Sequence, residues 1–215
     1  MNAQFVTFEG LDGSGKSTHL RRAIEWLEGE GVPLVVSHEP GGTPLGQALR
    51  EVFLDARWGK LDGTVEALVI FASRRQHLLE VIEPALAAGR HVFCDRFTDS
   101  TLAYQGAGRG ADESVLLEID RLATGGRRPD RTLLFDLPAE AARHRGLSES
   151  RRGRPGGVDR LDREELAFYE RVRGGYLELA RAEPERFRVI DSTGEREETW
   201  RQVRDALSDL PGTGV

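Results

Sequence analysis

The feature that most constrains the fold is the eight-residue run GLDGSGKS, which begins at Gly10. It fits the phosphate-loop pattern G-x-x-x-x-G-K-[S/T] at every fixed position. An apolar, β-branched run typical of a strand (residues 5–9) precedes it, and residues 18–27 after it repeat apolar side chains at helical spacing. In this context the loop N–H groups and the helix N-terminus can bind phosphate. We therefore expect the chain to bind a nucleoside triphosphate.

The side chains of the loop have distinct expected tasks. Lys16 reaches the β- and γ-phosphates, and the Ser17 hydroxyl binds Mg²⁺. Only Lys16 and Lys60 are lysines among the 30 basic residues, so a chain that otherwise uses arginine keeps a compact ammonium where it fits among phosphates. The residues expected to bind the nucleotide are Gly10, Leu11, Asp12, Gly13, Ser14, Gly15, Lys16, Ser17 and Thr18.

Length and composition limit the classes of protein that remain. A chain of 215 residues suits one α/β domain spanning 1–215, and a net charge of −6 does not favour nucleic acid as a partner. The single cysteine, Cys94, lies in an apolar run and fits a buried thiol in a reducing compartment. No apolar stretch approaches the roughly 20 residues of a membrane span, and the N-terminus lacks a signal-peptide pattern. We expect a cytoplasmic protein with no membrane partner.

Four further short apolar runs, at 33–37, 91–94, 132–136 and 187–191, alternate with helical patterns. Because these runs are apolar rather than alternating, we expect strands that are covered on both faces. The order of elements predicts a five-stranded parallel sheet flanked by helices, an α/β fold with right-handed crossovers. Long helices are expected at 64–88, ending at Gly89, and at 161–182, ending before Pro184.

The segment 146–158 breaks this pattern, because it is rich in Gly, Ser, Pro and Arg and has almost no apolar side chains. Residues 143–160 carry six arginines and two carboxylates. A solvated charged loop would explain this composition. In an acidic chain with a phosphate loop, we favour a mobile cationic lid at 143–160 that closes over the triphosphate.

Asp95 and Arg96 follow the strand expected at 91–94. In a parallel α/β sheet the carboxyl ends of the strands form the ligand crevice, so both side chains should face the phosphate loop. A carboxylate there can hold Mg²⁺, usually through water. Asp136, at the end of another strand, is the alternative for this role, and we favour Asp95 because of its arginine neighbour.

Two further clusters suggest a second ligand site. After Glu39, Thr43 is a plausible N-cap and Pro44 fits the first helical position, so Arg50 lies two turns beyond on the same face. Alone this arginine would be a surface residue, but together with Arg96 it suggests a site for an anionic phosphoryl acceptor.

A base could bind between the expected long helix and the polar, glycine-rich run 100–110. Phe71 and Arg75 are four residues apart in that helix, so they could stack on a base and hydrogen-bond its edge. Phe71 alone would be a core residue.

This combination resembles the bacterial thymidylate kinase family, whose members phosphorylate dTMP with ATP. The matching segments are FEGLDGSGKST from Phe8, EPGGT from Glu39, DRF from Asp95, AYQG from Ala103, DR from Asp159 and YLELA from Tyr176. They run in the family's order and cover nearly the whole chain. The phosphate loop is shared by many nucleotide-binding proteins, whereas EPGGT together with DRF and AYQG is specific.

The resemblance implies roles for the matched residues. Asp12 would bind the 3′-hydroxyl of dTMP, Arg50 and Arg96 its phosphate, and Tyr104 would disfavour a 2′-hydroxyl. Phe71 would stack on thymine and Arg75 would read its edge. The full implied set of dTMP-binding residues is Asp12, Glu39, Arg50, Phe71, Arg75, Arg96, Ser100, Tyr104 and Gln105.

The resemblance also implies Mg²⁺ as cofactor, ATP and dTMP as small-molecule substrates, and a homodimer. Some members carry a catalytic arginine in the phosphate loop, but this chain has Gly13 there, so the lid should supply it. The candidates are Arg145, Arg151, Arg152 and Arg154; we favour Arg154, which Gly153 and Pro155 flank. The expected catalytic residues are Asp12, Lys16, Asp95, Arg96 and Arg154, with Ser17 and Asp95 at the metal.

Other classes of protein also carry a phosphate loop. A kinase for another nucleoside monophosphate shares most of these features. A nucleoside kinase would have no use for the two arginines of a second phosphate site. A guanine-nucleotide switch needs an Asn-Lys-x-Asp motif, and the only asparagine is Asn2. A binding protein with a vestigial loop would consume no ATP.

Overall fold

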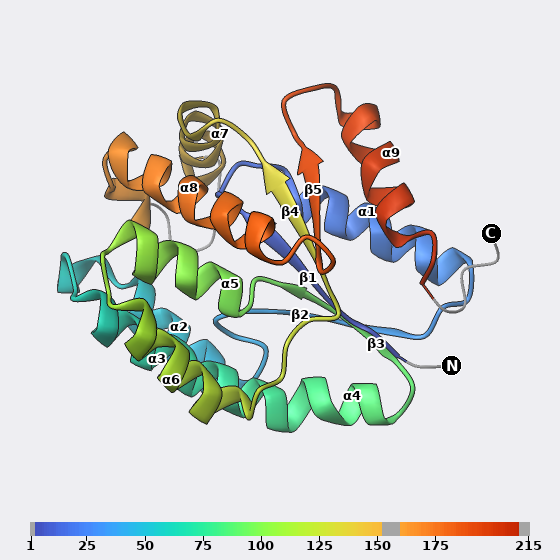
Figure 1. Cartoon of the computed structure of the whole chain (residues 1–215), viewed down its shortest axis with the longest axis horizontal. Helices are drawn as coiled ribbons and strands as arrows, with labels where there is room; N and C mark the ends of the chain where they lie inside the picture. The colour runs from blue at the N-terminus through green and yellow to red at the C-terminus, as the bar shows by residue number, and fades with distance from the viewer. Residues whose placement is uncertain (1–2, 152–159, 211–215) are drawn as a thin grey trace.

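The structure is a computed structural model, which describes residues 3–151 and 160–210. Its five strands form one parallel sheet in the order β2-β3-β1-β4-β5 (Figure 1). The strands are β1 (Phe5–Gly10), β2 (Leu34–His38), β3 (His91–Asp95), β4 (Arg131–Asp136) and β5 (Phe187–Asp191). The predicted five-stranded parallel α/β fold is therefore confirmed.

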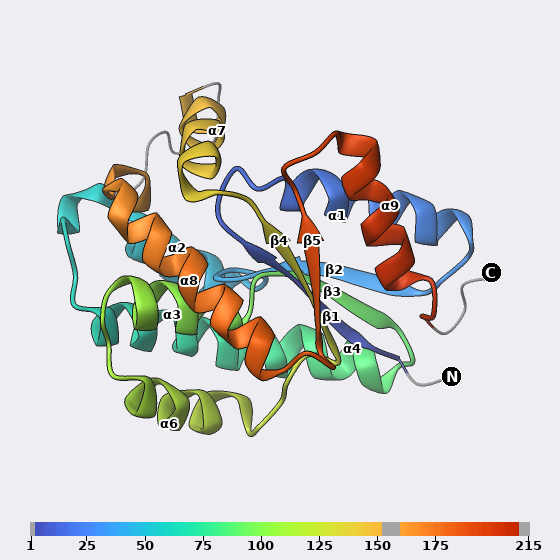
Figure 2. The same ribbon diagram turned by 45° about the horizontal axis from the view of Figure 1, so that its top comes forward.

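Helices cover both faces of the sheet (Figures 1 and 2). They are α1 (Lys16–Gly29), α2 (Pro44–Leu54), α3 (Gly63–His77), α4 (Glu83–Ala87), α5 (Thr98–Thr101), α6 (Glu113–Thr124), α7 (Ala139–Arg151), α8 (Leu166–Ala182) and α9 (Arg196–Leu207). Two 3₁₀ turns, η1 (Ala56–Trp58) and η4 (Leu161–Arg163), and two π-helical turns, η2 (Leu78–Ile82) and η3 (Leu102–Gly108), complete the described secondary structure. No helix in the described part of the chain is both long and apolar enough to cross a membrane.

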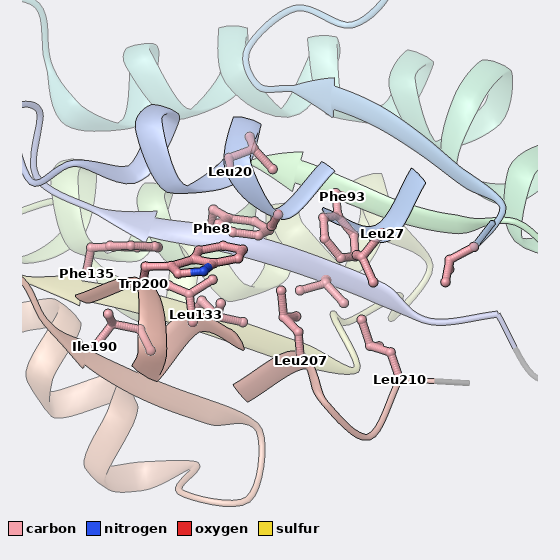
Figure 3. Close-up of a cluster of buried hydrophobic side chains, with 14 residues drawn as sticks. Phe8, Leu20, Leu27, Phe93, Leu133, Phe135, Ile190, Trp200, Leu207 and Leu210 are labelled. Carbon is pink, nitrogen blue, oxygen red and sulfur yellow. The ribbon is translucent and has the colours of Figure 1, made fainter. Parts of the chain in front are cut away.

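Alternation of side chains along the strands builds a core on each face. On one face Phe8 and Phe93 pack with Trp200 and Leu207 beneath α1 and α9 (Figure 3). On the other face the neighbouring strand residues, such as Val92, pack under the helical stretch that leads into α4. Both faces of the central strands are buried, which explains their continuous apolar sequence.

The long helix predicted at 64–88 forms as one helical stretch with an irregular centre. α3 passes through the π turn η2 into α4, and Gly89 follows with a φ of 73°. The helix predicted at 161–182 begins instead as the separate turn η4, and α8 starts only at Leu166.

The structure shows that the segment predicted as a lid begins in a helix. Residues 146–151 belong to helix α7 and are not a loop, since Ala, Glu and Arg favour helix over 139–151. α7 packs closely on the phosphate loop: a Cβ at Gly13 would overlap the carbonyl oxygen of Ala142. Residues 152–159, and with them Arg152 and Arg154, lie outside the described residues.

The core predicts a large cost for deleting a central ring. Phe93 is fully buried and its ring centroid is 5.4 Å from that of Phe8. Phe93→Ala should lower the free energy of unfolding by about 3–5 kcal/mol, measured by urea denaturation. Leu122→Ala, at a side chain that is 81% exposed, should change it by less than about 0.5 kcal/mol. Equal losses in the two variants would contradict this account of the core.

Candidate active site

The phosphate loop connects β1 to α1 as the sequence predicts. Gly10, Gly13 and Gly15 have φ values of 131°, 80° and 93°, a region that favours glycine. Lys16 begins α1 and is 5% exposed; its Nζ donates to the carbonyl oxygen of Leu11 at 3.0 Å and lies 3.9 Å from Asp12 Oδ1. Burial lowers the pKa of Lys16, so phosphate oxygens would compensate its desolvated charge.

Ser17 and Asp95 come together at the carboxyl edge of the sheet. β1 and β3 are adjacent parallel strands, and the Ser17 hydroxyl donates to Asp95 Oδ2 at 3.3 Å. Asp95 Oδ1 is buried with no hydrogen-bond partner in the described part of the chain. A hydroxyl and a carboxylate with an unused oxygen fit Mg²⁺ whose other ligands are phosphates and water. The alternative residue, Asp136, is instead engaged by Arg173, at 2.6 and 2.8 Å.

The described residues hold no cluster of three or more His, Cys, Asp or Glu side chains that could cage a metal.

Arg96 lies at the centre of the site and has a left-handed backbone, with a φ of 75°. Its guanidinium donates to Asp12 Oδ1 at 2.8 Å, to Ser100 Oγ and Tyr176 OH at 3.1 Å, and to Tyr104 OH at 3.3 Å. Because these four acceptors come from the phosphate loop, α5, η3 and α8, they fix the cation between separate parts of the chain.

Glu9 lies beneath this cluster and is fully buried. Its carboxylate accepts from Phe97 N at 2.7 Å, Ser100 Oγ at 2.5 Å and Tyr176 OH at 2.9 Å. Burial, reinforced by the nearby Asp99, raises the pKa of Glu9 to about 7. Sequence patterns alone predict no role for Glu9 or Tyr176. A lone carboxylate in an apolar strand was the available signal for Glu9.

A pocket opens beside Arg96 and adjoins the phosphate loop through Asp12. Seven of the residues predicted to bind an acceptor line it: Asp12, Glu39, Arg50, Arg96, Ser100, Tyr104 and Gln105. The other lining residues are Pro40, Phe53, Leu54, Ile70, Arg74, Phe97, Thr101 and Leu161. The lining thus combines apolar side chains with three arginines.

The structure does not bring Phe71 and Arg75 to this pocket. Phe71 is 2% exposed and packs against Leu102 and Leu116, while Arg75 Nη1 donates to the carbonyl oxygen of Ala123 at 3.3 Å. Ile70 and Arg74, one residue earlier, line the pocket instead. One residue turns a helix by about 100°, and both pairs have the same spacing, so spacing alone could not choose between them.

Arg74 is 1% exposed and is held on three sides. Its Nε donates to Glu39 Oε2 at 2.6 Å and its Nη2 to Thr101 Oγ1 at 3.1 Å. The guanidinium carbon lies 4.7 Å from the ring centroid of Phe71 and 4.8 Å from that of Phe97. Its Nη1 is buried without a hydrogen-bond partner among the described residues, so it can donate to a ligand atom.

A parallel sheet of this order, with a phosphate loop after β1 and an arginine-lined pocket beside it, defines a phosphate-loop kinase of the nucleoside monophosphate type. The thymidylate kinase family model matches residues 8–203. The chain belongs to the thymidylate kinase family.

Individual relatives agree over nearly the full length. The thymidylate kinase of Desulfosudis oleivorans is 47% identical over 208 residues, which cover 96% of this chain and 97% of that protein. The one from Neisseria gonorrhoeae is 45% identical over 207 residues, with 96% and 97% covered. A crystal structure of thymidylate kinase from Ehrlichia chaffeensis aligns with a TM-score of 0.75 at 32% identity, covering 97% of this chain and 99% of that one.

The raised pKa of Glu9 predicts a dependence of stability on pH. The folded protein binds this proton more tightly than the unfolded chain, so Glu9 contributes most below its ordinary pKa of 4.5, and that contribution is lost as the pH rises through about 7. The free energy of unfolding of the unsubstituted protein minus that of Glu9→Gln should therefore fall between about pH 5 and pH 8. Urea denaturation across this range measures it. A difference that stays constant, or rises, would contradict the assignment.

Proposed function

We propose that the protein transfers the γ-phosphoryl group of ATP to the phosphate of dTMP, giving dTDP and ADP. The observation that carries this proposal is the position of Asp12. Its carboxylate is 3.9 Å from Lys16 Nζ and 2.8 Å from Arg96 Nη2, so it joins the phosphate loop to the second anion site. A donor phosphate on Lys16 and an acceptor phosphate on Arg96 would be neighbours, as phosphoryl transfer requires.

On the acceptor side, Arg96 and Arg50 bind the dTMP phosphate and Asp12 binds the 3′-hydroxyl. Thymine lies along the apolar side chain of Ile70, with the free Nη1 of Arg74 donating to a carbonyl oxygen of the base. This assignment moves the expected base-binding roles from Phe71 and Arg75 to the residues that line the pocket. Tyr104 and Gln105 line the pocket near the sugar, and Tyr104 disfavours a 2′-hydroxyl.

On the donor side, the loop N–H groups and Lys16 bind the β- and γ-phosphates. Ser17 and Asp95 would hold the Mg²⁺ that accompanies ATP, and this ion offsets charge on the phosphates when bound. The transition state is loose and spreads charge over three oxygens, so Lys16 and Arg96 act by electrostatic stabilisation. A further arginine is expected from residues 143–160. Arg145 is exposed on α7, and Arg154, which we favour, lies outside the described residues.

We also propose a homodimer that forms through α2 and α3. These helices pack against each other and carry large exposed apolar side chains. They are Leu45 and Val52 on α2, and Val65 and Leu68 on α3, each between 47% and 53% exposed. Exposed apolar side chains gathered on neighbouring elements are typical of an interface. The cytoplasmic location stays a prediction from the sequence.

The nucleotide that accepts the phosphoryl group distinguishes this kinase from kinases for other monophosphates. A panel of acceptors therefore tests the proposal. With ATP and Mg²⁺, ADP release should be fastest with dTMP and about 10- to 200-fold less efficient with dUMP, because one methyl group in an apolar pocket contributes about 1–3 kcal/mol. Purine monophosphates should be rejected more strongly because of their size. Thymidine should be inert, since it brings no phosphate to Arg96. Equal efficiency with dAMP would favour a kinase for another monophosphate, and use of thymidine would contradict the second anion site.

Substitution of the two cations separates the two phosphate sites. Arg96→Ala should lower kcat/KM for dTMP by about 10²-fold or more, the effect of a buried charge-assisted contact, while the Kd of a non-hydrolysable ATP analogue changes little. Lys16→Ala is the matched variant, and it should lose turnover by several orders of magnitude. If Arg96→Ala weakened the ATP analogue more than dTMP, the two sites would be exchanged.

A further inference from the structure

A chain of buried polar side chains lies behind the acceptor pocket, and two of its members, Ser37 and His77, have no part in the proposed mechanism. Ser37, at the end of β2, has its Oγ 2.6 Å from Nε2 of His77 on α3. The Nδ1 of the same ring is 2.8 Å from Glu39 Oε1, and the other oxygen of Glu39 accepts from Arg74 Nε at 2.6 Å. His77 is fully buried, Arg74 and Glu39 are 1% and 2% exposed, and Ser37 is 9% exposed.

The chemistry of these groups indicates which group donates each hydrogen bond. An ionised carboxylate only accepts, so His77 Nδ1–H and Arg74 Nε–H both donate to Glu39. A neutral imidazole then has its Nε2 lone pair left, and this accepts from the Ser37 hydroxyl. Both oxygens of Glu39 are thereby engaged, and the carboxylate is held in one orientation.

A serine, a histidine and a carboxylate in this order have the geometry of a nucleophilic triad, but the surroundings exclude that role. The backbone of Gly42 lies directly over the pair. A Cβ built there would be 2.7 Å from Ser37 Oγ and from a ring carbon of His77. Gly42 thus blocks access of a substrate atom to the Ser37 hydroxyl. Any effect of these hydrogen-bonded residues on the reaction must pass through the residue at the other end of the series.

The residue at the other end of this hydrogen-bonded series is Arg74. Of the four residues in the series, only Arg74 and Glu39 line the pocket. Glu39 accepts a hydrogen bond from Arg74 Nε, and Thr101 accepts one from Arg74 Nη2. Nη1 is therefore the donor that has no partner among the described residues. Rotation of the Glu39 carboxylate would free Arg74 Nε and change the direction of the whole planar guanidinium. The orientation of the unpartnered donor thus depends on residues that do not touch the pocket.

We propose that Ser37 and His77 are positioning residues for Arg74, which they orient through Glu39 so that Nη1 points at the acceptor base. This inference rests on the proposed function, since it needs dTMP in the pocket. Ser37 and His77 thereby take part in base recognition, although neither side chain lines the pocket.

The test compares steady-state kinetics of variants along the chain. His77→Phe keeps the ring and removes both nitrogens. It should raise KM for dTMP about tenfold, the effect of roughly one net hydrogen bond to a charged group, while kcat changes by less than about threefold. The Kd of a non-hydrolysable ATP analogue should stay unchanged, which also shows that the variant is folded. His77→Asn retains a donor near the Nδ1 position and should recover most of the loss. Ser37→Ala is a smaller change, so it serves as the folded variant if His77→Phe does not fold. It should also raise KM for dTMP.

A double-mutant cycle separates positioning from a structural role. In an Arg74→Gln background His77→Phe should have little further effect on KM for dTMP, because the residue that it positions is gone. The control is Gln76→Ala, which removes a partly exposed side chain on the same helix that does not line the pocket, and it should leave all constants unchanged. Equal KM effects of His77→Phe with and without Arg74, or a loss confined to kcat, would overturn the proposal. Failure of the unsubstituted protein to phosphorylate dTMP would instead overturn the proposed function.

Discussion

The site depends on the parallel pairing of β1 with β3. Phe8 pairs with Asp95, and Arg96 N donates to the carbonyl oxygen of Phe8 at 3.0 Å. Both strands therefore end at the same edge, one in the phosphate loop and the other in a carboxylate and an arginine. The loop cannot move relative to β3 without breaking this pairing in the central sheet.

The site also pairs its cations with carboxylates, and the pair of Arg74 with Glu39 is fully buried. Arg96 lies above Glu9 and beside Asp12, and Arg74 is paired with Glu39. Breaking such a pair by removing one member is costly, because the remaining charge stays buried. The interior of this protein therefore holds its cations in place before any phosphate binds. Binding then requires little reorganisation, which is the condition for effective electrostatic catalysis.

The sequence predicted the strands and the loop well because local chemistry determines them. The apolar runs that became the central strands β1, β3 and β4 are buried on both faces, and glycines at 10, 13 and 15 allow the loop its positive φ values. The helix at the start of the lid segment was not predicted. The composition of 146–151 is that of a loop, yet α7 extends to Arg151.

By itself the sequence determined the class of fold, the phosphate loop and the residues at the strand ends, because each follows from a short segment and its neighbours. Only the tertiary structure decided which face of α3 meets the acceptor, and so placed Ile70 and Arg74 at the pocket and Phe71 and Arg75 away from it. It alone showed that Glu9 and Tyr176, 167 positions apart, share a hydrogen bond under Arg96. Such relations depend on helix rotation and on contacts between distant segments, and neither leaves a periodic signal in the chain.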